Sequence, residues 1–158
     1  MKQNKYINKV IFFLNTKGYI TDILELESST RTAQDAANTI GCEVAQIAKT
    51  IVFIEENSEK PIIVIASGSN RINTNKIKES TGLILKKADA EYIISETGCV
   101  IGGVPPVGHN NKMLTFLDND LKKHNLLWVA AGTSLSVFKL TPTDLALLTD
   151  GTWLDLSE

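Results

Sequence analysis

The chain has few of the residues that build metal and disulfide sites. Its 158 residues include two cysteines and two histidines, and these are too scattered to give a metal-ligand spacing. No apolar run approaches the roughly 20 residues that cross a bilayer, and the apolar patch at 10–14 lacks the cleavage site of a signal peptide. We therefore expect a cytoplasmic protein with reduced thiols, no metal, no cofactor and no membrane partner.

Basic charge is also scarce. The chain contains sixteen Lys and Arg residues and eighteen Asp and Glu residues, which give a net charge of −2. Proteins that grip long stretches of nucleic acid usually carry a basic excess, so DNA is not an expected partner and any nucleic-acid contact should be local. Small groups of lysines could make such a contact or could simply be solvated surface: Lys76, Lys78, Lys86 and Lys87, and Lys112, Lys122 and Lys123.

What is present is the composition of one folded domain. Hydrophobic residues make up 43% and charged residues 22% of the chain, and this length can bury a sizeable core. No linker or repeat interrupts residues 1–158. Hydrophobic periodicity, caps and turn residues predict helices at 4–16, 32–40, 73–79, 89–95 and 142–148, and a helical turn at 44–47. They predict strands at 20–26, 50–54, 61–66, 83–85, 113–117, 126–131 and 136–140.

The hairpin signal at 56–60 and the irregular placement of the helices favour a mixed sheet over a regular βαβ array. The expected fold class is therefore α+β.

The loop G-G-V-P-P-V-G-H at 102–109 is the most distinctive segment. Gly102 and Gly103 can bring backbone N–H groups close to a ligand, and Pro105 and Pro106 stiffen the loop. Such a loop could hold an oxygen that gains negative charge during a reaction. It could equally be a tight connection between two strands.

Three further residues are candidates for chemistry. Lys49 opens an apolar strand, so it is either a cation beside a site or a surface lysine at a strand edge. Cys99 and His109 could form a nucleophile and its base. However, Cys99 precedes Val100 and Ile101, and an apolar setting makes a thiol inert. A cysteine nucleophile is therefore not expected, and we expect His109 to close the loop or to touch substrate.

The order of several motifs resembles a known family. From about Leu24 to Leu148 the chain contains T-A-Q-D-A-A-N-T-I-G, E-V-A-Q-I-A-K-T-I-V-F, S-G-S-N-R-I-N, the loop at 102–109, and W-V-A-A-G-T-S-L-S-V-F-K-L-T-P-T-D-L. This series is similar to the YbaK/EbsC family of aminoacyl-tRNA deacylases, which are related to the editing insertion of bacterial prolyl-tRNA synthetase. The resemblance implies a freestanding editing domain with a curved, mixed, largely antiparallel and barrel-like sheet flanked by helices.

The resemblance also implies site residues. Lys49 corresponds to the lysine that opens the central strand of these proteins, and 102–106 corresponds to their G-x-x-x-P loop. The expected catalytic residues are Lys49, Gly102 and Gly103. The expected substrate-binding residues are Pro105, Pro106, His109, Gly132, Thr133 and Ser134.

One segment departs from the family's cysteinyl-tRNA deacylases. These carry a basic stretch and an Asp where this chain has T-S-L-S-V at 133–137. The departure puts cysteine specificity in doubt.

The resemblance implies a trans-editing deacylase that hydrolyses the ester of mischarged tRNA. The expected substrate is tRNA(Pro) carrying alanine, cysteine or serine, and the expected partners are the acceptor end of that tRNA and prolyl-tRNA synthetase. The ester is activated, so the chemistry needs oxyanion stabilisation by glycine amides and an anchoring cation rather than a strong nucleophile. The alternatives are a non-catalytic module that binds tRNA ends or a synthetase, and a hydrolase of another ester or amide.

Overall fold

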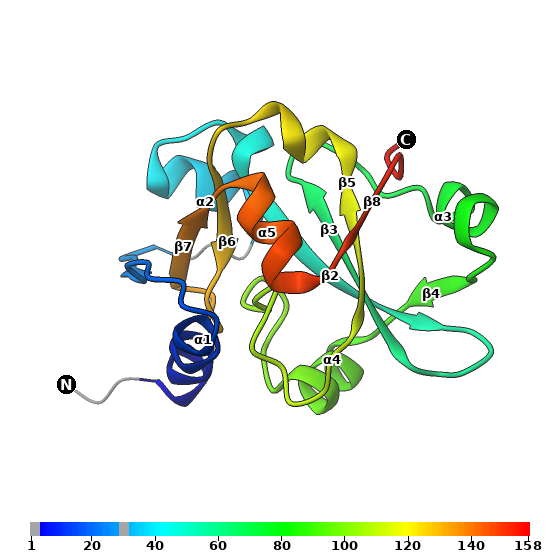
Figure 1. The fold of residues 1–158 in the computed structure, drawn as a ribbon, viewed down its shortest axis with the longest axis horizontal. Helices are drawn as coiled ribbons and strands as arrows, with labels where there is room; N and C mark the ends of the chain where they lie inside the picture. Colours follow the sequence, from blue (N-terminus) through cyan, green and yellow to red (C-terminus); the bar gives the residue numbers. More distant parts are fainter. Residues whose placement is uncertain (1–3, 29–31) are drawn as a thin grey trace.

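The computed structural model describes residues 4–28 and 32–158. They form one α+β domain in which two sheets pack around a central core, with helices on the outside (Figure 1). The helices are α1 (Lys5–Thr16), α2 (Ala33–Ile40), α3 (Thr74–Thr81), α4 (Ala90–Thr97) and α5 (Pro142–Thr149), with short 3-10 helices η1 (Val44–Gln46) and η2 (Asn119–Lys123). The strands are β1 (Leu24–Glu25), β2 (Ala48–Glu55), β3 (Pro61–Ser67), β4 (Leu85–Lys87), β5 (Leu114–Asp118), β6 (Leu127–Ala130), β7 (Ser136–Leu140) and β8 (Thr152–Leu154).

The larger sheet has the strand order β4-β2-β3-β5-β8, and the smaller one has the order β1-β7-β6. Strand β3 is antiparallel to β2 and parallel to β5, so the larger sheet is mixed. Four of the six pairings in the described residues are antiparallel. In the part of the chain that the structure describes, one isolated β-bridge, between Ile47 and Trp128, joins the two sheets. The α+β class and the mixed sheet are thus confirmed. Within the described residues the strands do not close into a barrel, so the barrel-like shape is not confirmed.

Most helix ends follow from local capping. Thr32 accepts a hydrogen bond from the Asp35 N–H at the start of α2, and Gly41 ends that helix with a φ of 85°. Asp89 and Gly98 bound α4 in the same way. The predicted strand at 20–26 shrinks to the two residues of β1, because only these pair with β7. Helix η2 and strand β8 were not predicted.

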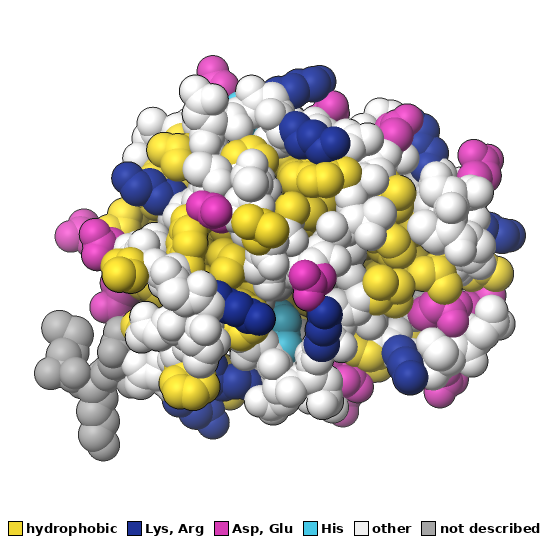
Figure 2. Space-filling model, in the orientation of Figure 1, with side chains coloured by type: hydrophobic (Ala, Val, Ile, Leu, Met, Phe, Trp, Pro, Cys, Tyr) yellow, Lys and Arg dark blue, Asp and Glu magenta, His cyan; other side chains and the backbone are white. Residues whose placement is uncertain are grey.

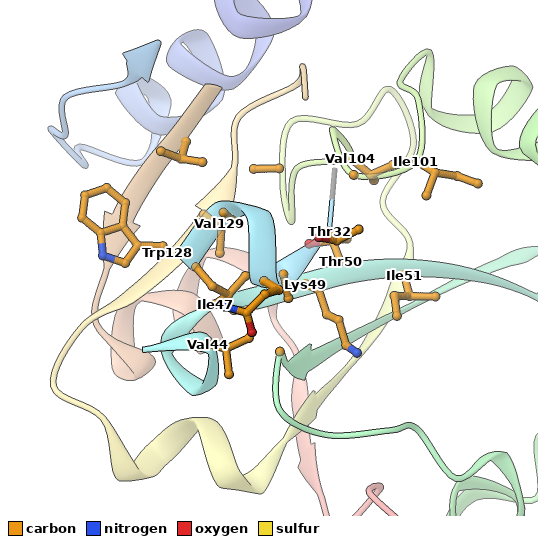
Figure 3. Close-up of a pocket in the computed structure, with 18 residues that line it drawn as sticks. Thr32, Val44, Ile47, Lys49, Thr50, Ile51, Ile101, Val104, Trp128 and Val129 are labelled. Atoms are coloured by element: carbon orange, nitrogen blue, oxygen red, sulfur yellow. The ribbon is translucent and has the colours of Figure 1, made fainter. Parts of the chain in front are cut away.

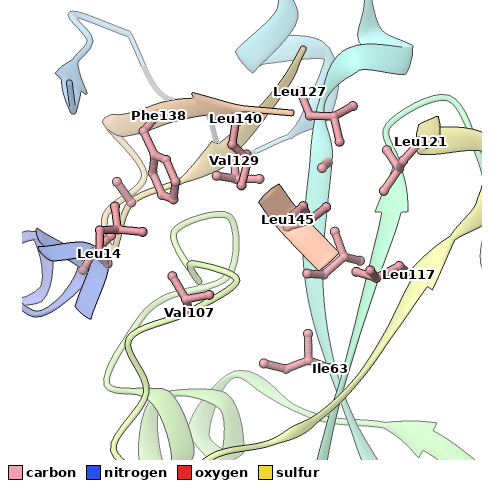
Figure 4. Packing of buried hydrophobic residues seen from close by; sticks show 14 of the residues in the cluster. Leu14, Ile63, Val107, Leu117, Leu121, Leu127, Val129, Phe138, Leu140 and Leu145 are labelled. Carbon is pink, nitrogen blue, oxygen red and sulfur yellow. The ribbon is translucent and has the colours of Figure 1, made fainter. Parts of the chain in front are cut away.

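The main core lies between the two sheets (Figure 4). Leu14 of α1, Ile63 of β3, Leu117 of β5 and Phe138 of β7 meet there, each with at most 2% of its surface exposed. A second cluster fills the space between the larger sheet and α3. Full burial of such a side chain is worth about 1.5–3 kcal/mol. Strand β3 is therefore buried on both faces, and its neighbour β2 pairs with it from Ala48 to Ile54.

The surface matches the near-neutral charge of the chain. On the face shown in Figure 2, basic and acidic side chains are interspersed, and no broad patch of one sign is visible. Among the described helices, none combines the length and the apolar composition that crossing a bilayer requires.

Candidate functional site

A cavity of about 520 Å³ lies where β2, the first turn of α2, strand β6 and the loop at 101–104 come together (Figure 3). This volume is typical of sites for small ligands, which span roughly 300–1,000 Å³. Lys49 and Thr50 of β2 and Gly102 and Val104 of the loop are among the residues that line it. Apolar side chains, with Trp128 among them, line much of the rest. The structure thus brings Lys49 and Gly102, fifty-three positions apart, to one pocket.

Lys49 is a half-buried cation in this pocket. Its Nζ donates a hydrogen bond to the backbone oxygen of Asn70 over 2.9 Å. Burial lowers the pKa of Lys49 from its usual value; the charge of Asp118 opposes this shift, and that of Arg71 adds to it. Its position beside buried residues favours the site role over that of a free surface lysine.

A buried carboxylate holds the partner of Lys49 in place. Asp118, with 1% of its surface exposed, accepts hydrogen bonds from the Ser67 N–H at 3.1 Å and from Asn70 Nδ2 at 2.8 Å. Its other oxygen accepts from the Asp120 N–H at 2.9 Å. Sequence reasoning did not single out Asp118 or Asn70. The only signal was the S-G-S-N motif, in which Asn70 follows β3.

The two glycines of the loop have different surroundings. Gly102 lines the pocket with a φ of 87°, a left-handed conformation that favours glycine. Within the described part of the chain, its N–H donates to no protein acceptor. The Gly103 N–H instead donates to the Val100 oxygen at 2.9 Å. A Cβ on Gly103 would lie 2.8 Å from the carbonyl carbon of Thr133. Gly102 therefore fits the oxyanion role, whereas Gly103 packs the loop against its neighbour.

The expected substrate-binding residues do not gather in this pocket. Pro106 and His109 line a second cavity of about 170 Å³. His109 Nε2 lies 2.8 Å from the Pro105 oxygen, which can only accept, so Nε2 carries the proton. Burial lowers the pKa of His109, and its geometry is that of a neutral residue that closes the loop.

The loop at 132–134 also lies beside the pocket rather than in its lining. Gly132 has a φ of 112°, and a Cβ there would lie 3.0 Å from the backbone of Tyr6. Thr133 Oγ1 donates to Ser136 Oγ at 2.8 Å. Ser134 borders a neighbouring hollow with Ile101. The backbone of Thr133 and Ser134 packs against Gly103 of the Gly-Pro loop, and the substrate-binding role of the three residues stays a prediction.

The cysteine-based alternative finds no support in the geometry. Cys99 is buried, its thiol donates to the Thr97 oxygen at 3.6 Å, and burial raises its pKa. No hydrogen bond joins it to His109 within residues 4–28 and 32–158. No three His, Cys, Asp or Glu side chains in those ranges gather in a way that could hold a metal ion.

A residue missed by sequence reasoning is Thr50. Its Oγ1 is buried in the wall of the pocket and has no hydrogen-bond partner among the described residues. A hydroxyl at the start of the otherwise apolar run T-I-V-F-I was the signal that could have found it.

The fold and the pocket identify the class. Residues 27–148 match the model of the aminoacyl-tRNA editing domain, and the chain belongs to that family. YwhH of Bacillus subtilis (strain 168), an uncharacterised protein, is 31% identical over 136 residues, covering 85% of this chain and 86% of that protein. EbsC of Enterococcus faecalis (strain ATCC 700802 / V583), described as a candidate Cys-tRNA(Pro)/Cys-tRNA(Cys) deacylase, is 25% identical over 131 residues, or 79% of this chain and 76% of that protein.

A solved structure agrees with these sequence relatives. The crystal structure of a candidate trans-editing enzyme for prolyl-tRNA synthetase superposes with a TM-score of 0.91 at 38% identity, covering 99% of both chains. Within the editing domains, these similarities place the chain in the YbaK/EbsC group.

Proposed function

We propose that this protein hydrolyses the ester bond of mischarged aminoacyl-tRNA in trans, and that its substrate is tRNA(Pro) carrying alanine, cysteine or serine. The observation that carries the proposal is the pocket that both Lys49 and Gly102 line, where the Gly102 N–H has no acceptor among the described residues. The family, the description of EbsC and the trans-editing structure support the reaction type. Apolar walls formed by Ile47, Val104 and Val129 suit a small side chain.

The reaction adds water to the ester carbonyl carbon. The bond from that carbon to the ribose oxygen then breaks, the ribose oxygen takes up a proton, and the free amino acid leaves. Catalysis requires a held carbonyl, an aligned water and stabilisation of the oxyanion. The Gly102 N–H is the proposed oxyanion donor, and one such donor is typically worth about 3–4 kcal/mol. The Lys49 ammonium anchors the terminal phosphate or ribose.

The direct test is a panel of purified Ala-, Cys-, Ser- and Pro-tRNA(Pro), with release of the free amino acid as the readout. We expect hydrolysis of at least one mischarged tRNA, its loss in Lys49→Ala and its retention in Lys60→Ala, which changes an exposed lysine between β2 and β3. Binding of all four tRNAs with no release of amino acid would instead identify a non-catalytic module and overturn the proposal.

A further inference from the structure

Part of strand β2 presents an unpaired edge to the pocket. On one side β2 pairs with β3 along its length. On the other side β4 pairs only with Phe53–Glu55, and the bridge to β6 involves only Ile47. Among the described residues, no strand therefore covers 49–52 on that side, and the pocket lies against this gap. The backbone groups that face the gap are available to a ligand.

The hydrogen-bond register identifies which backbone groups these are. The Glu55 N–H donates to the Lys60 oxygen, and the Gly68 N–H donates to the Ile47 oxygen. In an antiparallel ladder, alternate residues exchange both bonds with the partner strand. The odd-numbered residues from 47 to 55 thus bond to β3, and the even-numbered ones face the other edge. The Glu56 N–H, which donates to the Ile84 oxygen beside β4, fits this parity. Thr50 consequently points its N–H and C=O into the gap.

The side chain of Thr50 adds a third polar group. Its buried Oγ1 has no partner within the described residues. A buried hydroxyl without a hydrogen bond costs about 1–3 kcal/mol, and valine would fill nearly the same space without this cost. Figure 3 shows the Thr50 side chain on the side of β2 that faces the Val104 loop, whereas the Lys49 side chain leaves on the opposite side. This is the alternation of a pleated strand.

The aminoacyl end of a charged tRNA has the complementary groups. Its α-ammonium is a donor and its ester carbonyl is an acceptor, arranged as the N–H and C=O of one residue are in a strand. We propose that the aminoacyl group docks on the β2 edge as a one-residue strand opposite Thr50. Its α-ammonium donates to the Thr50 C=O and Oγ1, and the Thr50 N–H donates to the ester carbonyl oxygen. This assignment of a substrate-binding residue rests on the proposed function.

The proposed docking has two consequences for recognition. The substrate ammonium and the Lys49 ammonium lie on different sides of the strand, which limits their repulsion. Recognition through the amino-acid backbone also requires a free α-amino group, whatever the side chain. Acetylation of that nitrogen removes its charge and two of its three donors.

The test uses a stable analogue, 3′-alanylamino-3′-deoxyadenosine, in which an amide replaces the ester and both recognition groups remain. Binding is measured by calorimetry for the wild type, Thr50→Val and Thr50→Ser. Loss of one hydrogen bond to a charged group should weaken binding in Thr50→Val by about 10- to 100-fold, and Thr50→Ser should restore it. The N-acetyl analogue should bind at least about 10-fold more weakly to the wild type.

Stability provides the matched contrast. Thr50→Val should unfold at the same temperature as the wild type or higher, because an unpartnered hydroxyl is removed. In the control, Thr81→Val, the lost hydroxyl donates to the Ile77 oxygen and accepts from the Leu83 N–H. This variant should unfold at a lower temperature and bind the analogue normally.

The outcomes separate the two proposals. The role of Thr50 is overturned if the wild type does not bind the analogue. It is also overturned if Thr50→Val binds the analogue as tightly as the wild type does and the wild type binds the N-acetyl analogue equally well. Both results hold whatever the protein hydrolyses. Binding that depends on Thr50, together with no hydrolysis of any mischarged tRNA, supports that role and overturns the proposed function alone.

Discussion

Replacing Lys49 by methionine removes the charge from the pocket while keeping an unbranched side chain of similar length. The lost hydrogen bond to the Asn70 oxygen involves a charged donor and is worth about 1.5–3 kcal/mol. Half-burial of the ammonium costs free energy in the opposite direction, as its lowered pKa indicates. The two effects largely cancel, so we expect the free energy of unfolding to change by no more than about 1 kcal/mol. Deacylation should fall by about 100- to 1,000-fold, the usual cost of removing a preorganised electrostatic contact.

The assay combines denaturant unfolding with single-turnover release of amino acid from mischarged tRNA. Lys49→Arg should also be impaired, because a planar guanidinium does not replace a compact ammonium. Lys60→Met, which changes an exposed lysine, is the control, with stability and turnover near those of the wild type. A folded Lys49→Met protein with turnover within about threefold of the wild type, less than 1 kcal/mol of barrier, would refute the reasoning.

The lowered pKa of Lys49 also predicts that the free energy of unfolding depends on pH in the alkaline range. The folded state releases the Lys49 proton at a lower pH than the unfolded state, whose lysine has a pKa near 10.5. Between these two values the unfolded state binds more protons, so the free energy of unfolding rises with pH. The wild type should therefore gain stability relative to Lys49→Met as pH rises through this window, and a constant difference would contradict the assigned burial.

Three further predictions concern the neighbouring loop and the thiols. Gly103→Ala should lower the free energy of unfolding by about 1–3 kcal/mol, because its Cβ would press against the backbone of the loop at 132–134; an unchanged urea midpoint would contradict this packing. The pKa of the half-buried His109 is lowered from 6.5 in the folded state, so just below pH 6.5 the unfolded chain binds more protons than the folded one. Stability should therefore fall as pH drops below 6.5, and His109→Gln should flatten that dependence in urea titrations. Chelators and the double change Cys42→Ala with Cys99→Ala should leave deacylation intact, because burial raises the pKa of both thiols; loss of activity restored by one metal would overturn this.

The sequence predictions were accurate where an element depends on interactions between residues close in the chain, and they failed where it depends on distant residues. Helix α2 was predicted from Thr32 to Gly41 because both caps act within one turn. The β2–β3 hairpin was predicted because a polar segment separates two apolar runs. Strand β8 was missed because its three residues are held by parallel pairing with β5, more than thirty positions upstream. The separation into two sheets was missed for the same reason.

The sequence by itself determined the family, the α+β class and two members of the pocket, Lys49 and Gly102. These are carried by residue order, by local caps and by the unusual backbone freedom of glycine. Only the tertiary structure decided which of the candidate site residues line the pocket and which lie elsewhere. It places His109 in a second cavity and uses the Gly103 amide inside the loop. Within the described residues, it also leaves the Thr50 Oγ1 without a hydrogen-bond partner, on a strand edge that β4 covers only at Phe53–Glu55. Whether a backbone group is paired depends on which distant strand lies beside it, and no local pattern of residues specifies that neighbour.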